Sequence, residues 1–268
     1  MEKILIFDGL NFIWRAAASS FDQSNDDVII YNFFRSFRSI IEQFKPDRLF
    51  FVLEGRPEFR YALYSEYKAN RIKIASKEED TIKVFKAKDK IVNLLKYLPV
   101  SICYAEKYEC DDVINTLCNE FYNNDITIIS NDSDYIQLLQ RNFKKINIYD
   151  PIKKKYMDSI KYPYVVFKSL VGDKADNIPG ILSFKEAIKI LNNPNLFKSF
   201  LSKEENRSRF NINKQLIEFR NVSLDELIMM EGNAEYDLLQ DAFLDMKFVS
   251  ITNKWCDFVE TFDCLLGV

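Results

Sequence analysis

Apolar and polar residues alternate in short blocks through the first 150 residues of the chain. Apolar runs typical of β-strands occur at 3–8, 48–54, 101–106, 126–130 and 146–150. Between them lie stretches in which apolar residues recur at helical spacing, at 28–44, 81–98 and 111–123. Strands that alternate with helices predict an α/β fold whose mostly parallel central sheet is flanked by helices on both faces.

The pattern changes after about residue 160. Long β-like runs give way to helical patterns such as "KEAIKILNN" and "NKQLIEFRNVSL", with no internal repeat and no low-complexity linker. We therefore expect an α/β core over residues 1–160 and a smaller helical domain over residues 161–268.

Composition agrees with a folded protein. Of the 268 residues 47% are hydrophobic and 15% aromatic, which is enough for a substantial core. The start "MEKILIFDGL" lacks the small-residue cleavage site of a signal peptide. The apolar runs are also far shorter than the ~18 residues that cross a bilayer. We expect a cytoplasmic protein.

Histidine is absent from the chain, and the five cysteines form no CxxC pair. Reduced thiols, mostly in the core, are the interpretation we favour for these cysteines. The lack of histidine excludes Ser-His triads, histidine general bases and His-ligated zinc. Carboxylates are then the main catalytic resource.

Acidic residues cluster at positions where the predicted strands end. The candidates are Asp8, Glu54, Glu109, Asp111, Asp112, Asp132, Asp134, Asp173 and Asp176. Ligands of parallel sheets gather beyond the carboxyl ends of the strands, so we expect these acids to share one rim. Each has a plainer interpretation when taken alone, because "DG" and "GDKADNIPG" are typical of turns and "DSD" of a helix N-cap.

The distribution of charge matters more than the net charge of −3. Once the nine candidate acids are set aside, 37 basic residues remain against 31 acidic ones. A basic body around an acidic pocket is what a metal-dependent nuclease requires. The lysine-rich region 65–90 is either a solvated helix face or a basic segment that overhangs the predicted rim.

Five segments taken together resemble the 5′-nuclease family. They are "FDGLNFIWRA" (7–16), "FRYALYSEYKANR" (59–71), "YECDDV" (108–113), "SNDSDYIQLL" (130–139) and "GDKADNIPG" (172–180). The family comprises flap endonucleases, the 5′-nuclease domain of bacterial DNA polymerase I and bacteriophage 5′-nuclease/RNase H enzymes. The resemblance spans about residues 3–190, and "YDPIKKKYM" and "GDKADN" are most similar to the bacteriophage enzymes.

The resemblance implies a PIN-like core with a basic helical arch at about 65–95 and a helical, DNA-binding C-terminal domain. It implies that Asp8, Glu109 and Asp111 hold a first metal ion with Glu54 nearby. A second ion would be held by Asp132, Asp134, Asp173 and Asp176, with Asp112 between the two ions. The implied catalytic residues are Lys68, Arg71, Asp8 and Asp112, and the implied DNA contacts are Arg15, Arg60, Lys68, Arg71, Lys83 and Lys185.

Physical chemistry supports a metal site independently. Carboxylates that converge on one pocket repel each other, which raises their pKa values unless cations are bound. Ligands that are all oxygen favour Mg²⁺ or Mn²⁺ over zinc. Two ions ~4 Å apart would stabilise the attacking and leaving oxygens of a phosphodiester displacement.

These arguments predict a structure-specific 5′ nuclease, acting as a 5′–3′ exonuclease or flap endonuclease in primer removal during replication. The expected substrate is a DNA or RNA–DNA duplex with a 5′ end or flap. We also expect a monomer that works beside replication proteins, in the host cytoplasm if the protein is viral.

The sequence departs from the family pattern at two places. Glu54 stands where the family usually has Asp, so it is expected to act through water instead of binding metal directly. The segment after "DNIPG" is about two residues shorter than in the family and lacks the later glycines of the hairpin with which family members bind duplex DNA. Separately, Phe12 and Trp14 have two interpretations, stacking on an unpaired base or core packing.

Three other functions compete with this prediction. A PIN-type ribonuclease for single-stranded RNA would lack "YKANR" and the "GD…DN" acids. An aspartyl phosphatase would repeat Asp two positions after Asp8, where Leu10 stands. A DNA-binding relative without catalysis would have lost a metal ligand, whereas Glu54 keeps its charge.

Overall fold

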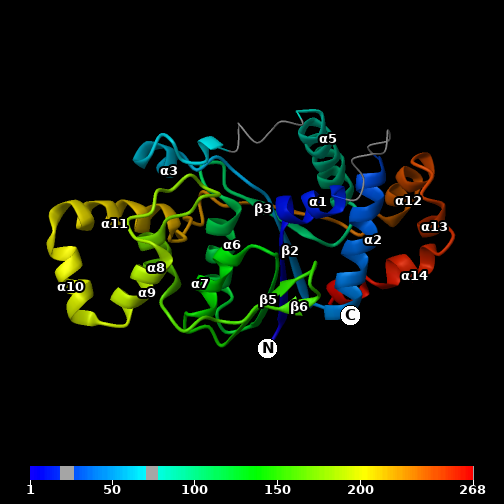
Figure 1. Ribbon diagram of the computed structural model, residues 1–268. Helices are drawn as coiled ribbons and strands as arrows, with labels where there is room; N and C mark the ends of the chain where they lie inside the picture. Colours follow the sequence, from blue (N-terminus) through cyan, green and yellow to red (C-terminus); the bar gives the residue numbers. More distant parts are fainter. Residues whose placement is uncertain (19–26, 71–77, 268) are drawn as a thin grey trace.

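A seven-stranded sheet forms the centre of the protein in a computed structural model that describes residues 1–18, 27–70 and 78–267 (Figure 1). The strand order is β6-β5-β4-β1-β2-β3-β7. The strands are β1 (Lys3–Asp8), β2 (Arg48–Val52), β3 (Ser101–Tyr104), β4 (Asp125–Ile129), β5 (Lys145–Asp150), β6 (Lys155–Tyr156) and β7 (Ile228–Glu231). The five central strands are parallel, and β6 and β7 pair antiparallel at the edges.

Alternate residues of the strands pack into two separate cores. In β1, Leu5 and Phe7 face one core while Ile4 and Ile6 face the other, as the two-residue repeat of a strand requires. Both sets are almost completely buried. The sheet is thus covered on both faces, and the predicted α/β fold class is confirmed.

Helices from both ends of the chain cover the first face. They are α1 (Gly9–Ala17), α2 (Asp27–Phe44), α5 (Glu78–Leu95), α12 (Tyr236–Asp245), α13 (Val249–Thr252) and α14 (Trp255–Glu260), followed by η2 (Asp263–Leu265). Phenylalanine rings link these elements, for example Phe34 of α2 with Phe243 of α12 at 4.9 Å between centroids. The C-terminal helices therefore return to the core that the first strand builds (Figure 1).

The opposite face is covered by α6 (Cys110–Glu120) and α7 (Ile136–Leu139), which follows η1 (Ser133–Tyr135). Further out on this side lies a group of helices with cores of its own (Figure 1). It comprises α8 (Tyr164–Val171), α9 (Phe184–Leu191), α10 (Pro194–Ser202) and α11 (Glu204–Ile217), and α3 (Glu58–Leu63) packs against α11.

The division of the chain near residue 160 stays a prediction, with two physical qualifications. β7 extends the central sheet by pairing with β3, for example Met229 with Cys103. Helical patterns dominate the sequence beyond residue 160, and the four residues Ile228–Glu231 give only a short β-signal beside them. Residues 164–217 are the part that stands apart as a helical unit.

The helices predicted from periodicity lie close to their observed bounds, and the arch is only partly described. The expected helices 28–44, 81–98 and 111–123 correspond to α2, α5 and α6, shifted by one to three residues. Of the predicted arch, residues 71–77, including Arg71, lie outside the described residues. Among the described helices, none has both the length and the apolar character that crossing a membrane requires.

Candidate active site

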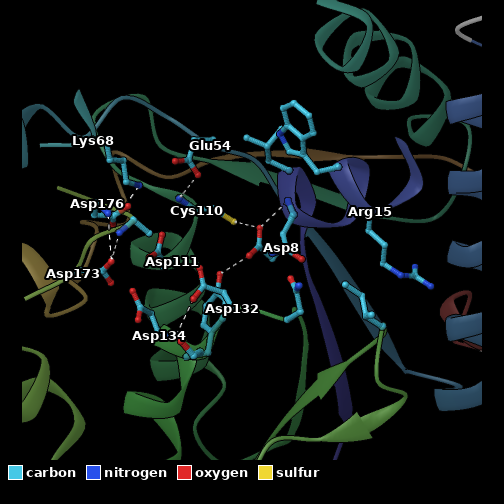
Figure 2. A pocket seen from close by; sticks show the side chains of 18 of the residues that line it. Asp8, Arg15, Glu54, Lys68, Cys110, Asp111, Asp132, Asp134, Asp173 and Asp176 are labelled. Atoms are coloured by element: carbon cyan, nitrogen blue, oxygen red, sulfur yellow. Dashed lines mark hydrogen bonds and ion pairs between the residues drawn. The ribbon is translucent and has the colours of Figure 1, made fainter. Parts of the chain in front are cut away.

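The carboxyl ends of β1, β2 and β4 meet at one edge of the sheet, and a cavity of about 580 Å³ opens there. Register places Asp8 beside Val52 and Phe7 beside Ile129. Acids that follow these strands are thereby brought together (Figure 2). Seven described carboxylates line the cavity: Asp8, Glu54, Asp111, Asp132, Asp134, Asp173 and Asp176.

Asp8 is held at the junction between β1 and α1. Its Oδ1 accepts a hydrogen bond from the Asn11 backbone N–H at 3.3 Å, which caps the helix. Its Oδ2 accepts from the Ser130 hydroxyl at 3.0 Å. Gly9 lets α1 start directly against β2. A Cβ at this position would lie only 2.4 Å from the Val52 carbonyl oxygen. Asp8 is thus fixed in place.

Glu54 lies two residues beyond β2 and accepts a hydrogen bond from the Cys110 backbone N–H at 3.3 Å. Asp132 follows β4 and accepts from the Asp134 N–H at 2.9 Å as the N-cap of η1. Both side chains are exposed to solvent at the mouth of the cavity, and protein atoms crowd them on the other sides. Desolvation is the largest cause that raises the pKa of each to about 7; neighbouring carboxylates add to the rise, and at Glu54 the Lys68 charge opposes it.

The loop after α8 supplies two more of the acids, Asp173 and Asp176. Asp173 Oδ1 accepts from the backbone N–H groups of Ala175 at 2.7 Å and Asp176 at 3.3 Å. An isolated bridge between Asp173 and Ile178 closes the loop. Burial is the largest influence and would raise the pKa of Asp173, but the hydrogen bond and charge of Lys168 together with the Ala175 and Asp176 N–H donors lower it overall.

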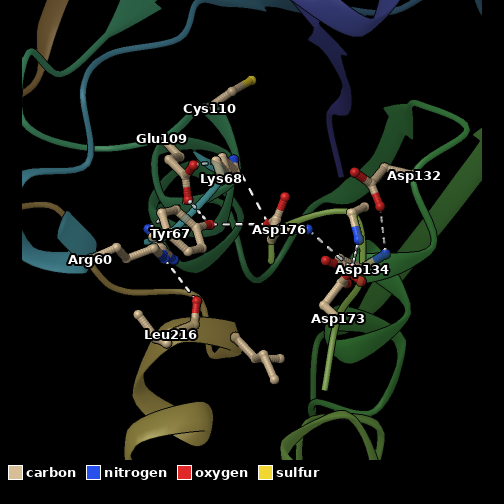
Figure 3. Close-up of polar contacts among 12 residues, drawn as sticks. Arg60, Tyr67, Lys68, Glu109, Cys110, Asp132, Asp134, Asp173, Asp176 and Leu216 are labelled. Carbon is tan, nitrogen blue, oxygen red and sulfur yellow. Dashed lines mark hydrogen bonds and ion pairs between the residues drawn. The ribbon is translucent and has the colours of Figure 1, made fainter. Parts of the chain in front are cut away.

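Two lysines pair with the carboxylates across the cavity wall, and Figures 2 and 3 show one of them, Lys68. Lys168 of α8 contacts Asp173 and lies 3.5 Å from Asp134. Lys68 contacts Glu109 and lies 3.8 Å from Asp176. Burial would lower the pKa of Lys68, but the surrounding carboxylates raise it overall. Both ammonium groups are therefore charged and bridge acids from different segments.

Lys68 is also held by its backbone. It lies in the left-handed region with φ 56°, uncommon for a non-glycine residue. Its N–H donates to the Asp176 carbonyl oxygen at 2.9 Å, and the neighbouring Tyr67 hydroxyl donates to Asp176 at 3.1 Å. The "YKANR" segment is thus tied to the "GDKADN" loop, across more than 100 residues of sequence.

Three of the predicted site residues lie behind the cavity wall and not in it. Arg60 and Asp112, both buried, form two hydrogen bonds of 2.5 and 2.9 Å. Asp112 also accepts from the Arg220 N–H at 2.8 Å. Glu109 is 1% exposed and lies 3.0 Å from Arg60. A guanidinium buried in this way cannot reach a DNA backbone, so the predicted DNA contact of Arg60 needs correction.

The metal roles predicted for Glu109 and Asp112 meet the same objection, because neither residue lines the cavity. Asp112 is 0% exposed and does not line the cavity. Its neighbour Asp111 does line the cavity, and burial followed by Glu109 raises the pKa of Asp111 well above its usual value. Consecutive residues of a helix point about 100° apart. One acid of the pair therefore faces the site and the other the interior.

The remaining predicted DNA contacts are spread out. Arg15 lines the cavity and extends from α1 away from the carboxylates (Figure 2). Lys83 on α5 is half-buried and Lys185 on α9 is exposed, and neither lines the cavity. Of the two aromatic residues, Phe12 packs in the core, 4.9 Å from Phe7, whereas Trp14 lines the cavity.

The donor set of the cavity fits a hard divalent cation, because every charged ligand in it is a carboxylate. The raised pKa values of Asp8, Glu54 and Asp132 reflect the crowding and burial that a cation would relieve. As the side chains stand, no group of three or more acids or thiols in the described part of the chain is placed to hold an ion. Lys68 instead pairs with Glu109 and Asp176, and Lys168 pairs with Asp134 and Asp173.

Sequence analysis missed Lys168, Tyr67 and Tyr164. The Tyr164 hydroxyl donates to Asp134, and the Tyr67 hydroxyl donates to Glu109 at 2.9 Å. One signal was present, because Lys168 is a charged residue inside an otherwise apolar helix, five residues before Asp173. Tyr67 stands in the polar "YKANR" segment and Tyr164 begins an apolar stretch, and neither context marks a tyrosine as part of a site.

The mostly parallel sheet and the carboxylate cavity at its carboxyl edge define the class of 5′ nucleases with a PIN-like fold. Residues 3–168 match the family described as "5′-3′ exonuclease, N-terminal resolvase-like domain". The chain belongs to this 5′-3′ exonuclease family, so the predicted family membership is confirmed.

Curated relatives of different lengths agree with this membership. The chain is 34% identical over 210 residues to DNA polymerase I of Caldicellulosiruptor bescii, covering 70% of this chain and 24% of that protein. It is 32% identical over 213 residues to the 5′-3′ exonuclease of Mycoplasmopsis pulmonis, covering 74% and 68%. Flap endonuclease Xni of Pseudoalteromonas translucida is 27% identical over 247 residues, covering 81% and 93%.

Solved structures share the fold at lower identity. The bacteriophage T5 D15 flap endonuclease in complex with DNA and metal ions superposes with a TM-score of 0.61 at 17% identity, covering 96% of this chain and 99% of that one. Flap endonuclease-1 from Methanococcus jannaschii gives a TM-score of 0.66 at 12% identity, covering 99% and 93%.

Proposed function

We propose that the protein is a structure-specific 5′ nuclease, a metal-dependent phosphodiester hydrolase acting at or near 5′ ends of DNA or RNA–DNA duplexes. The observation that carries this proposal is the single cavity lined by seven carboxylates at the carboxyl edge of the sheet. The relatives named 5′-3′ exonuclease and flap endonuclease support the same activity. The relatives named DNA polymerase I support a role in replication, where primer removal is the context we propose.

The cavity divides into two sets of acids. Asp8, Glu54 and Asp111 would hold one Mg²⁺ or Mn²⁺ ion, and a second set would hold another: Asp132, Asp134, Asp173 and Asp176. Such ions, when bound, polarise a phosphoryl oxygen and lower the pKa of bound water. Because the chain has no histidine, carboxylates and water are left to accept protons in the site.

Lys68 and Lys168 would have a second role once ions neutralise the carboxylates. Their ammonium groups lie in the cavity wall, 13% and 17% exposed. Released from the acids, each could donate to a phosphate oxygen of the substrate, where a positive charge stabilises the charge that develops during displacement. We propose that the nuclease acts as a monomer, beside replication proteins.

Cleavage of end-labelled substrates tests the proposal. A 5′-flap duplex, a nicked duplex, an RNA-primed duplex and single-stranded RNA are incubated with the protein in Mg²⁺ or in EDTA. We expect cuts near the 5′ end of the duplex substrates in Mg²⁺ and none in EDTA. Cleavage of single-stranded RNA alone would instead identify a PIN-type ribonuclease.

A DNA-binding relative without catalysis is the second candidate. The pairing of Asp134 and Asp173 with Lys168 favours it, because these acids are already compensated in the described structure. It predicts tight binding to flap DNA with no cleavage in either Mg²⁺ or Mn²⁺. The same substrates therefore separate the two candidates.

A further inference from the structure

A second hollow of about 470 Å³ adjoins the carboxylate cavity, and we call it the α1–α2 groove. It lies between α1, α2 and the turn that joins β5 to β6. Arg15 lines both the cavity and the groove. The β5–β6 turn also borders both, with Ile152 in the cavity and Lys154 in the groove. The two hollows are therefore neighbours joined by shared elements.

The groove has the opposite charge to the cavity. Among the described residues, its charged lining is Arg15, Arg35 and Lys154, with no Asp or Glu. Among the described residues none of these three cations forms an ion pair. Hydroxyl and amide donors complete the lining, including Ser36, Ser39 and Asn32. Cations and neutral donors without competing carboxylates are the chemistry that binds phosphate.

Arg15 is the least exposed of the three cations that line the groove. Its guanidinium lies 5.1 Å from the Phe12 ring centroid, and its Nη1 is buried with no hydrogen-bond partner. A buried N–H donor without an acceptor is unfavourable and rare in folded proteins. Nη1 itself is closed to solvent, but the Arg15 side chain lines the groove, where a phosphate would offset its charge.

The backbone of the β5–β6 turn holds Lys154 at the groove. Asp150 accepts hydrogen bonds from the N–H groups of Ile152 at 2.9 Å and Lys153 at 3.0 Å, which fixes the turn. The ammonium of Lys153 lies 3.2 Å from Asp150, so that carboxylate is engaged. Lys154 follows with φ 53°, a left-handed conformation, and its exposed side chain keeps its charge for another partner.

We propose that the α1–α2 groove binds a phosphate of the substrate strand next to the position of cleavage. The inference rests on the proposed nuclease function and extends it from the cavity to a second substrate contact. The bound group is either an internal phosphodiester or a 5′-terminal monophosphate. Both present the same anionic oxygens to Arg15, Arg35 and Lys154.

Binding measurements test the groove without depending on catalysis. Fluorescein-labelled 5′-flap and nicked duplex DNAs are titrated with the full chain in EDTA at several salt concentrations. For Arg35→Gln and for Lys154→Gln we expect affinity at low salt to fall about three- to tenfold, with the slope of log affinity against log salt reduced by about one per variant.

Lys45→Gln is the matched control. Lys45 is exposed and precedes β2, at the amino end of the sheet and away from the carboxylates, and its loss changes net charge equally. We expect its affinity and salt slope to stay at wild-type values. If the groove variants match this control, and thermal melting shows all three folded, the groove does not bind substrate.

Two further binding experiments distinguish a 5′-terminal monophosphate from an internal phosphodiester as the bound group. If the groove binds a 5′-terminal monophosphate, wild type prefers 5′-phosphorylated over 5′-hydroxyl DNA and the groove variants lose that preference. If it binds an internal phosphodiester, one neutral methylphosphonate linkage weakens wild-type binding but weakens Arg35→Gln no further. Absence of both effects overturns the proposal.

Failure of the proposed nuclease function would look different. In that case wild type leaves the same DNAs uncut in Mg²⁺, whatever the groove variants do to binding. If the nuclease is active and the groove binds substrate, the variants raise KM by a larger factor than they lower kcat.

Discussion

Charge compensation governs the individual residues of the cavity. Lys168 bridges Asp134 and Asp173, and Lys68 bridges Glu109 and Asp176. Buried or half-buried charges are tolerated only when such partners or bound ions offset the loss of water. Each substitution at the site therefore changes catalysis, stability or both, depending on whether the residue faces the cavity or the interior.

Asp132 faces the cavity and has no lysine within ion-pair distance among the described residues. We expect Asp132→Asn to slow cleavage of a 5′-flap duplex in Mg²⁺ by about a hundredfold or more, because loss of a ligand removes several kcal/mol of charge stabilisation. DNA affinity in EDTA should change by less than about twofold. Asp158→Asn, an exposed acid outside the cavity, is the control, and cleavage by Asp132→Asn at the wild-type rate contradicts the assignment.

Lys68 reaches the cavity from the "YKANR" segment. We expect Lys68→Ala to lower the single-turnover cleavage rate by a much larger factor than it lowers DNA affinity, since its ammonium would stabilise charge that develops only during displacement. Equal losses in rate and affinity would show that Lys68 only tethers the substrate.

Arg60 and Asp112 belong to the interior. We expect Arg60→Met to lower the free energy of unfolding by about 3–5 kcal/mol, because it leaves the buried Asp112 carboxylate without its partner. Urea denaturation without DNA measures this loss. In the double variant Arg60→Met, Asp112→Asn the uncompensated charge is gone and part of the loss should return. A stable Arg60→Met that binds DNA weakly would restore Arg60 to the DNA contacts.

At the scale of elements, the loop between α8 and α9 decides where two of the acids lie. Gly172 ends α8 with φ 74°, and a Cβ there would lie 2.4 Å from the Gly180 N. Asn213 of α11 donates to the Ser169 carbonyl at 3.0 Å and the Pro179 carbonyl at 2.9 Å, which ties the loop to the helical unit. The position of Asp173 therefore depends on backbone packing as well as on its own side chain.

We expect Gly172→Ala to cost about 1–3 kcal/mol from the left-handed backbone alone, with more from the crowding at Gly180. The displaced loop should also slow flap cleavage at least tenfold. Gly267→Ala is a matched control, since Gly267 has φ 69° but no described atom within 4 Å of a Cβ. Urea denaturation and cleavage assays compare the two, and equal effects would show that crowding does not matter.

Elements with a strong local signal were predictable, and those without one were not. Buried strands such as 3–8 and amphipathic helices such as 28–44 have periodic apolar patterns, and both appear close to their predicted bounds. β7 and β6 have four and two residues and owe their existence to pairing with β3 and β5. The partner of β7 lies more than 100 residues earlier in the chain, and β6, which pairs locally with β5, is too short to show an alternating pattern.

At the scale of the whole molecule, acidic charge is concentrated in one cavity. Burial is the main cause that raises the pKa values of Glu54 and Asp132 to about 7, against about 4 in an unfolded chain. Their contribution to stability is present in full below about pH 4 and is lost as pH rises through 7, because the folded protein binds the extra protons.

We therefore expect the melting temperature of the metal-free protein in EDTA to fall by several degrees between pH 5 and pH 8. Mg²⁺ should restore stability at pH 8 and much less at pH 5, where protons compete for the same oxygens. Differential scanning fluorimetry with EDTA or MgCl₂ measures both effects.

The double variant Glu54→Gln, Asp132→Asn isolates these two groups. Relative to wild type, its metal-free melting temperature should rise with pH over the same interval, since it cannot lose the two protons. A difference that does not change with pH would show that other groups control the pH dependence.

The order of strands and helices, the parallel sheet and the placement of acids at strand ends were all determined by the sequence itself. They follow from local periodicity and from the rule that parallel strands share one carboxyl edge. Only the tertiary structure decided that Asp111 faces the cavity while Asp112 pairs with Arg60 in the interior. Adjacent residues on a helix point in different directions, and which direction meets solvent depends on elements that pack from elsewhere in the chain.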